Sequence, residues 1–124
     1  MYKLKKMKTR FKTIEEIKDI LERKIFVSEN KESYIFSDDT YTVMHGDFSL
    51  LIRRNNIVWK NIKSKYKYSI FQYESNFIFR TSENEISPKE NEFIISLDSH
   101  ATGEYSLALI SLEDKTERLR LLSD

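Results

Sequence analysis

The stretch Tyr34-Ile35-Phe36-Ser37-Asp38-Asp39-Thr40-Tyr41-Thr42-Val43 decides the fold class. Apolar or aromatic side chains occupy every second position on both sides of an acidic Ser-Asp-Asp segment. A period of two places such side chains on one face of a strand, and aspartates favour a tight turn. The stretch therefore predicts an antiparallel hairpin.

The same alternation recurs along the rest of the chain, in short runs separated by turn residues. These runs are Phe48 to Ile52, Ile57 to Trp59, Tyr66 to Ile70, Phe77 to Phe79, Phe93 to Leu97, Tyr105 to Leu109 and Leu119 to Leu121. Residues 82–91, with Pro88, form the one long polar loop, and Asp98 to Gly103 form a second loop. No connection is long enough for the crossover that parallel strands need. We therefore expect a mainly β fold of eight to ten strands in an antiparallel up-and-down meander.

Several of these runs are apolar on both faces. Leu51, Ile78, Ile94 and Ile110 lie on the side opposite the main apolar set. Closure or strong curling of a sheet removes exposed strand edges. The meander is therefore expected to close or curl into a small barrel.

One helix is predicted ahead of the strands. Thr13 and Glu16 have the spacing of a capping box, and Ile14, Ile17 and Leu21 recur at helical intervals. We place this helix at residues 13–24. A chain of 124 residues is one domain by length, so we expect a basic arm over 1–12 and one barrel-like domain over 13–124.

Composition excludes several function classes. The chain has no cysteine, so it can hold neither a disulfide nor a cysteine-based metal site. Only two glycines are present, which argues against phosphate-cradling loops. The lysine-rich start leads into no apolar segment, and no apolar run approaches the roughly 20 residues that cross a bilayer. A cytoplasmic protein without a signal peptide or membrane span is expected.

The residues that could carry catalysis are few and scattered. His45 and His100 each lie beside turn residues, far apart in the sequence, so we interpret both as loop histidines. Asp38 and Asp39 occupy the place that a hairpin turn demands. No nucleophile elbow, phosphate loop, dinucleotide fingerprint or zinc-protease motif is present. The chain is therefore expected to be a non-enzyme with no cofactor and no metal.

The inward-facing aromatic residues suggest a ligand site. A small barrel either fills its interior with side chains or holds one small ligand there, and both alternatives remain open here. In the ligand hypothesis a small apolar or amphipathic molecule is bound by Trp59, Tyr41, Tyr68, Phe79 and Tyr105.

The alternative hypothesis places function on the outer surface. A basic stretch carries Arg53, Arg54, Lys60, Lys63, Lys65 and Lys67, and the segment 82–92 is acidic. Either could contact a protein partner, as in an inhibitor, an immunity protein or a phage-encoded antagonist of a host system. Single-stranded nucleic acid ranks behind these, because Tyr66 and Tyr68 point away from the face that carries Lys65 and Lys67. Monomer and dimer remain open.

The pattern resembles small bacterial lipocalin-like (calycin) domains. The resemblance rests on the short helix before the first strand, on the hairpin Tyr34 to Val43 and on the final strand Arg118 to Leu122. It implies a barrel and, by analogy, small-molecule binding. Two features depart from that family: Lys24-Ile25-Phe26 replaces its Gly-x-Trp signature, and Trp59 lies in mid-chain. Arg118 or Arg120 could be the arginine that packs across the barrel base in that family, without its usual Trp partner.

Overall fold

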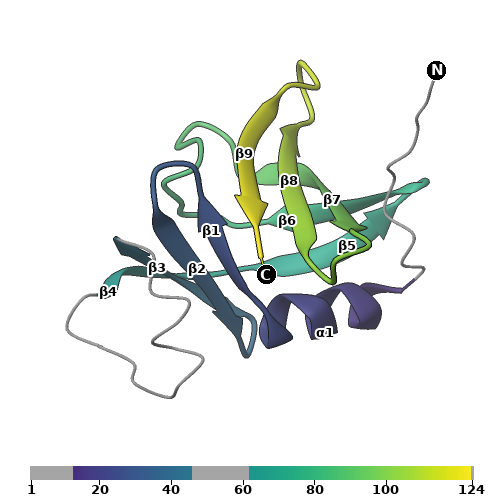
Figure 1. The fold of residues 1–124 in the computed structure, drawn as a ribbon. Helices are drawn as coiled ribbons and strands as arrows, with labels where there is room; N and C mark the ends of the chain where they lie inside the picture. The colour runs from purple at the N-terminus through teal and green to yellow at the C-terminus, as the bar shows by residue number, and fades with distance from the viewer. Residues whose placement is uncertain (1–12, 46–61, 124) are drawn as a thin grey trace.

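The computed structural model describes residues 13–45 and 62–123. Within these residues the chain forms one helix and nine strands (Figure 1). They are α1 (Ile14–Arg23), β1 (Ile25–Ser28), β2 (Glu32–Ser37), β3 (Thr40–His45), β4 (Ile62–Lys67), β5 (Ser69–Tyr73), β6 (Asn76–Arg80), β7 (Glu92–Ser99), β8 (Tyr105–Ser111) and β9 (Glu117–Leu122). The basic arm and the strands predicted over 48–52 and 57–59 lie outside the described residues.

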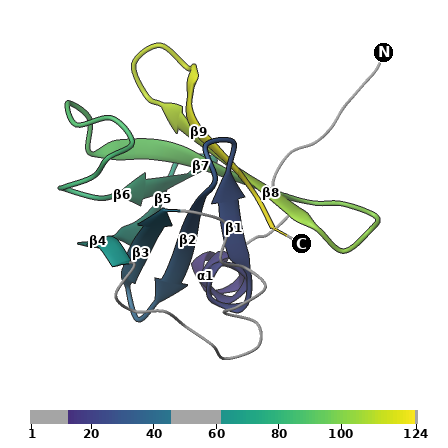
Figure 2. The ribbon, with the colours of Figure 1, turned by 60° about the vertical axis from the view of Figure 1, so that its left-hand side comes forward.

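The strands form one antiparallel sheet in the order β4-β3-β2-β1-β9-β8-β7-β6-β5. Its two end strands, β4 and β5, are consecutive in the chain and separated only by Tyr68. The sheet therefore curls into a nearly closed barrel, with the chain itself joining the two ends (Figure 2). The predicted mainly β fold, an antiparallel meander curled into a barrel behind one helix, is confirmed.

Tyr68 marks a change of pairing partner within this barrel. The sequence predicts one strand through Tyr66, Tyr68 and Ile70, but the structure divides it into two. β4 pairs with β3, and β5 pairs with β6. At the break, the Tyr68 N–H donates to the carbonyl oxygen of Asp39 at 3.0 Å, which continues the β3 ladder by one bond.

The hairpin of β2 and β3 forms as predicted. Tyr34 pairs with Val43 and Phe36 with Tyr41, so all four side chains face the interior. The turn residues Asp38 and Asp39 both have positive φ, of 52° and 63°, as a two-residue type I′ turn requires.

The helix α1 begins and ends close to its predicted bounds. The Thr13 hydroxyl accepts the Glu16 N–H at 3.1 Å, and Glu16 accepts the Thr13 N–H at 3.0 Å, which completes the capping box. The helix packs against β2 and β5 and lies across one end of the barrel (Figure 1). Its buried side chains, Ile17, Ile20 and Leu21, join the barrel core.

The barrel interior holds the main hydrophobic core. It gathers inward-facing residues from the strands around the barrel, among them Phe26, Phe36, Phe79, Phe93, Leu97, Leu107 and Leu121, and Tyr66 of β4 packs against it. On the opposite face, Ile78, Ile94 and Ile110 pair side by side across β6, β7 and β8. Three of the four apolar positions that predicted curling are thus neighbours in one row, and the fourth, Leu51, lies outside the described residues.

One predicted loop is wrong at its start. Asp98 and Ser99 were expected in a loop that runs to Gly103, but both belong to β7. They pair with Ser106 and Tyr105 of β8, which keeps them in the sheet despite their turn-forming residue types. The connection between β7 and β8 is correspondingly shorter than predicted. No helix in the described part of the chain is both long enough and apolar enough to span a membrane.

Candidate functional site

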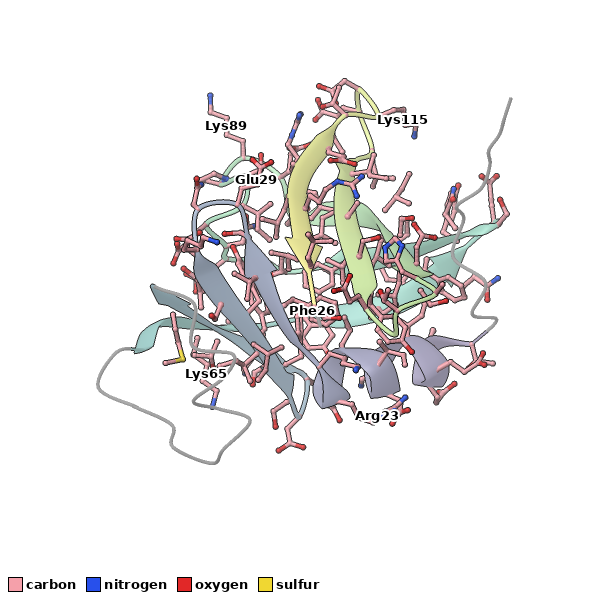
Figure 3. The ribbon with its side chains drawn as sticks, viewed as in Figure 1. Arg23, Phe26, Glu29, Lys65, Lys89 and Lys115 are labelled. Carbon is pink, nitrogen blue, oxygen red and sulfur yellow. The ribbon has the colours of Figure 1, made fainter. Side chains whose placement is uncertain are left out.

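Four tyrosines lie on the inner wall of the barrel. Tyr34 comes from β2, Tyr41 from β3, Tyr66 from β4 and Tyr68 from the break after β4. Cross-strand pairing places Tyr41 directly beside Tyr66. We call these four residues the tyrosine cluster. Figure 3 shows the contrast between the two faces, with Phe26 inside the barrel and Lys65 outside it.

Aromatic rings fill the space between these tyrosines. Phe36 lies 5.6 Å from Tyr41 and 5.5 Å from Tyr68, measured between ring centroids. Tyr68 stacks on Phe79 at 5.2 Å, with the ring planes only 12° apart. The middle of the barrel is therefore occupied by side chains, and any ligand must bind toward one of its ends.

At one end, the loop 81–91 supplies partners for the tyrosine hydroxyls. Tyr66 donates to Glu85 Oε2 at 2.9 Å, and the Tyr41 hydroxyl lies 3.0 Å from Thr81 Oγ1. Since the Thr81 hydroxyl donates to the Glu83 carbonyl oxygen, we assign the donor in the other bond to Tyr41. Burial raises the pKa of Tyr41 to about 12, so this tyrosine is neutral at physiological pH.

At the other end, Tyr68 lies beside the β2–β3 turn that contacts α1, because its N–H donates to the Asp39 carbonyl oxygen. Tyr68 is only 5% exposed, and its hydroxyl finds no hydrogen-bond partner among the described residues. Burial raises the pKa of Tyr68, and the negative charges of Glu22 and Asp39 raise it further. The hydroxyl is therefore neutral, buried and able to donate or accept one hydrogen bond.

Two polar contacts connect α1 to the β2–β3 turn at this end of the barrel. The Lys18 ammonium pairs with the Asp39 carboxylate, and Glu22 Oε2 accepts the Asp38 N–H at 3.1 Å. Both contacts are exposed to solvent, so each adds little stability by itself. The apolar side chains of α1 are what close this end.

The structure brings together three of the five predicted ligand-binding residues. Tyr41, Tyr68 and Phe79 are in mutual ring contact. Tyr105 is set apart from them at the start of β8, where the Lys24 ammonium lies 5.7 Å from its ring centroid. Trp59 lies outside the described residues.

The predicted basic face is described only in part. Lys65 and Lys67 are exposed on the outside of β4, whereas Tyr66 and Tyr68 face inward, as the alternation predicts. Lys63 belongs to β4, but its side chain is outside the description, as are residues Arg53, Arg54 and Lys60. Around Lys65 and Lys67, the charged side chains and the aromatic rings lie on opposite faces of β4. One nucleic acid strand therefore cannot contact both on the same face.

The acidic loop carries less free charge than its sequence suggests. The Glu90 carboxylate is 12% exposed and accepts hydrogen bonds from Arg118, Ser87 and Ser111. These bonds lower the pKa of Glu90 to about 2. Glu92 pairs with Arg80, and Glu85 is bonded to Tyr66. The glutamate side chains of this segment therefore connect it to the barrel through hydrogen bonds and ion pairs.

The structure describes the side chain of His100 and only the backbone of His45. His100 is exposed, and its Nε2 lies 3.1 Å from the Ser106 hydroxyl, while His45 ends β3. Among the described residues, no group of three or more histidine, aspartate or glutamate side chains could hold a metal ion. Comparison with family models, curated proteins and solved structures gave no match.

The sequence does not predict the polar groups that contact the tyrosine cluster. Thr81 and Glu85 belong to a loop whose composition indicates only a solvated segment, and nothing local points them at Tyr41 and Tyr66. The position of Glu22 is easier to predict from the sequence. It lies on the helix at a position one turn after Lys18, so the two side chains share a helix face.

Proposed function

We propose that this chain is a non-catalytic binding protein that holds a small amphipathic molecule at the helix end of its barrel. The polar group of that molecule pairs with the Tyr68 hydroxyl, and its apolar part lies between the aromatic interior and the buried face of α1. One observation carries the proposal: Tyr68 is buried in an aromatic interior with no hydrogen-bond partner for its hydroxyl.

An unpaired hydroxyl in this position is costly. Burying such a group without a partner costs about 1–3 kcal/mol, which is a large share of the stability of a small domain. Native proteins keep few such groups, and each one calls for a cause such as strain, a functional role or a bound partner. Two other hydroxyls of the tyrosine cluster, on Tyr41 and Tyr66, have partners within the chain.

The position of Tyr68 favours entry from the helix end. The rings of Phe36, Tyr41 and Phe79 pack around Tyr68, so we expect space for a ligand to come from an outward movement of α1. This helix has ten residues and closes the end with three buried side chains. The resemblance of the sequence to lipocalin-like domains supports the proposal by analogy only, since one fold hosts many functions.

Native mass spectrometry of the protein purified from its own cells tests the proposal. We expect an added mass of a small molecule that is lost when the protein is denatured. The Tyr68→Phe variant should be purified without most of that mass. Tyr73→Phe is the matched control, because Tyr73 is 62% exposed on the β5–β6 hairpin and should retain it.

Two results would overturn the proposal. One is a bare protein mass in the native spectra of the wild type. The other is a copurifying polypeptide or nucleic acid in place of a small molecule, which would move the function to the outer surface of the barrel.

A further inference from the structure

Among the residues that the structure describes, acidic side chains gather at the Tyr68 end of the barrel. Glu22 from α1 and both turn aspartates, Asp38 and Asp39, gather where the helix meets the β2–β3 turn. Lys18 is the cation that pairs with this group, and it neutralises Asp39 alone. Among the described contacts, Glu22 has a backbone N–H as its partner and no cation.

Two further cations in the described part of the chain have other contacts or positions. Lys67 pairs across the sheet with Thr40 and is exposed on the outer face. The Lys24 ammonium lies over the ring of Tyr105. The Tyr68 N–H bond to the Asp39 carbonyl oxygen, at 3.0 Å, places this acidic group beside Tyr68. Burial raises the tyrosine pKa, and the charges of Glu22 and Asp39 raise it further.

The Tyr68 hydroxyl does not itself select the charge of a ligand. A tyrosine hydroxyl donates to an acceptor or accepts from a donor with equal ease. A carboxylate such as Glu22 only accepts, and in a partly desolvated position it attracts a cation and repels an anion. Glu22 and its acidic neighbours therefore decide which head group can approach Tyr68.

We infer that the molecule bound at Tyr68 is a neutral or positively charged amphiphile, such as an amine or an alcohol, and that amphiphiles with a carboxylate head group are rejected. This inference rests on the proposed function and adds the chemical class of its ligand. In the bound state the head group lies between the Tyr68 hydroxyl and the Glu22 carboxylate.

Three probes with the same alkyl chain test the inference: decylammonium, decanol and decanoate. Binding of each monomeric probe to ligand-free refolded protein is measured by titration calorimetry. We expect decylammonium and decanol to bind, and decanoate to bind at least about tenfold more weakly than decylammonium.

Two variants locate the source of the selectivity. Glu22→Gln should reduce the preference for decylammonium over decanoate several-fold. Glu15→Gln is the matched control, because Glu15 is an exposed glutamate in the first turn of the same helix, away from the β2–β3 turn. It should leave the preference unchanged.

The outcomes separate the two claims. Equal binding of all three probes, or an unchanged preference in Glu22→Gln, would overturn the inferred ligand class and leave the site itself standing. Failure of all three probes to bind would overturn both the inference and the proposed site.

Discussion

Removing the Tyr68 hydroxyl should stabilise the ligand-free protein, although tyrosine-to-phenylalanine changes in a core usually destabilise it. The hydroxyl is buried and unpaired in the described structure, so Tyr68→Phe removes a desolvation cost and breaks no hydrogen bond. We expect the free energy of unfolding to rise by about 1 kcal/mol. For a domain of this size that corresponds to roughly 3–5 °C in Tm.

The matched variant is Tyr41→Phe, which should have the opposite effect. Tyr41 is just as deeply buried, but its hydroxyl donates to Thr81 over 3.0 Å. Loss of that bond should lower the free energy of unfolding by about 1 kcal/mol. Thr81 keeps its own bond to the Glu83 carbonyl oxygen, which limits the cost. The two variants should therefore differ from each other by about 2 kcal/mol.

Urea unfolding followed by circular dichroism measures both changes. The protein is first denatured, dialysed and refolded, so that a bound molecule does not contribute to stability. Tyr73→Phe, at an exposed tyrosine, should leave the midpoint unchanged. If Tyr68→Phe is destabilised as much as Tyr41→Phe, the Tyr68 hydroxyl has a hydrogen-bond partner in the free protein. That result would refute the prediction, which depends on the hydroxyl being unpaired.

Three further predictions follow from the charges and hydrogen bonds. The pKa of Glu90 is about 2, below its ordinary value of 4.5, so its contribution to stability is present above about 4.5 and is lost as the pH falls toward about 2. Glu90→Gln should be less stable than the wild type at neutral pH in urea titrations, and the difference should shrink across that window; a constant difference would contradict the assignment. The pKa of Tyr41 is raised from 10.0 to about 12, so its burial favours folding below pH 10 and ceases to do so as the pH rises toward 12. The wild type should therefore lose stability in that range, and Tyr41→Phe should lose less. Lys65→Glu combined with Lys67→Glu should leave Tm unchanged, because both side chains are exposed. Salt-dependent binding of the wild type to a single-stranded oligonucleotide, abolished in this double variant, would instead support the nucleic-acid hypothesis.

The elements that the sequence predicts well are those defined by local pattern. The hairpin Tyr34–Val43 carries both its alternation and its turn within ten residues, and the structure forms it with those side chains inside. The helix is equally local, because Thr13 and Glu16 set its start. In both cases residues close in sequence make the deciding contacts.

Features that depend on distant contacts could not be predicted. The alternation of Tyr66, Tyr68 and Ile70 is unbroken, so nothing local shows that the strand changes partners at Tyr68. The loop 81–91 is placed by bonds such as that between Glu90 and Arg118, which lie 28 positions apart. Asp98 has a turn-forming side chain, yet its pairing with Ser106 keeps it in β7.

The candidate site divides in the same way. The inward direction of Tyr41, Tyr68 and Phe79 follows from the period of the strands, so the sequence predicts that they share the interior. Which hydroxyl finds a partner depends on where the loop and the helix close the barrel. The tertiary structure therefore decides that the Tyr41 hydroxyl has a hydrogen-bond partner and that the Tyr68 hydroxyl has none among the described residues.

The most direct test of the central claim is a high-resolution crystal structure of the protein as purified from its own cells. The account predicts electron density for an organic molecule within hydrogen-bond distance of the Tyr68 hydroxyl, with α1 shifted outward to admit it. Density for an ordered water alone beside that hydroxyl, or a side chain bonded to it with α1 in its present place, would contradict the claim.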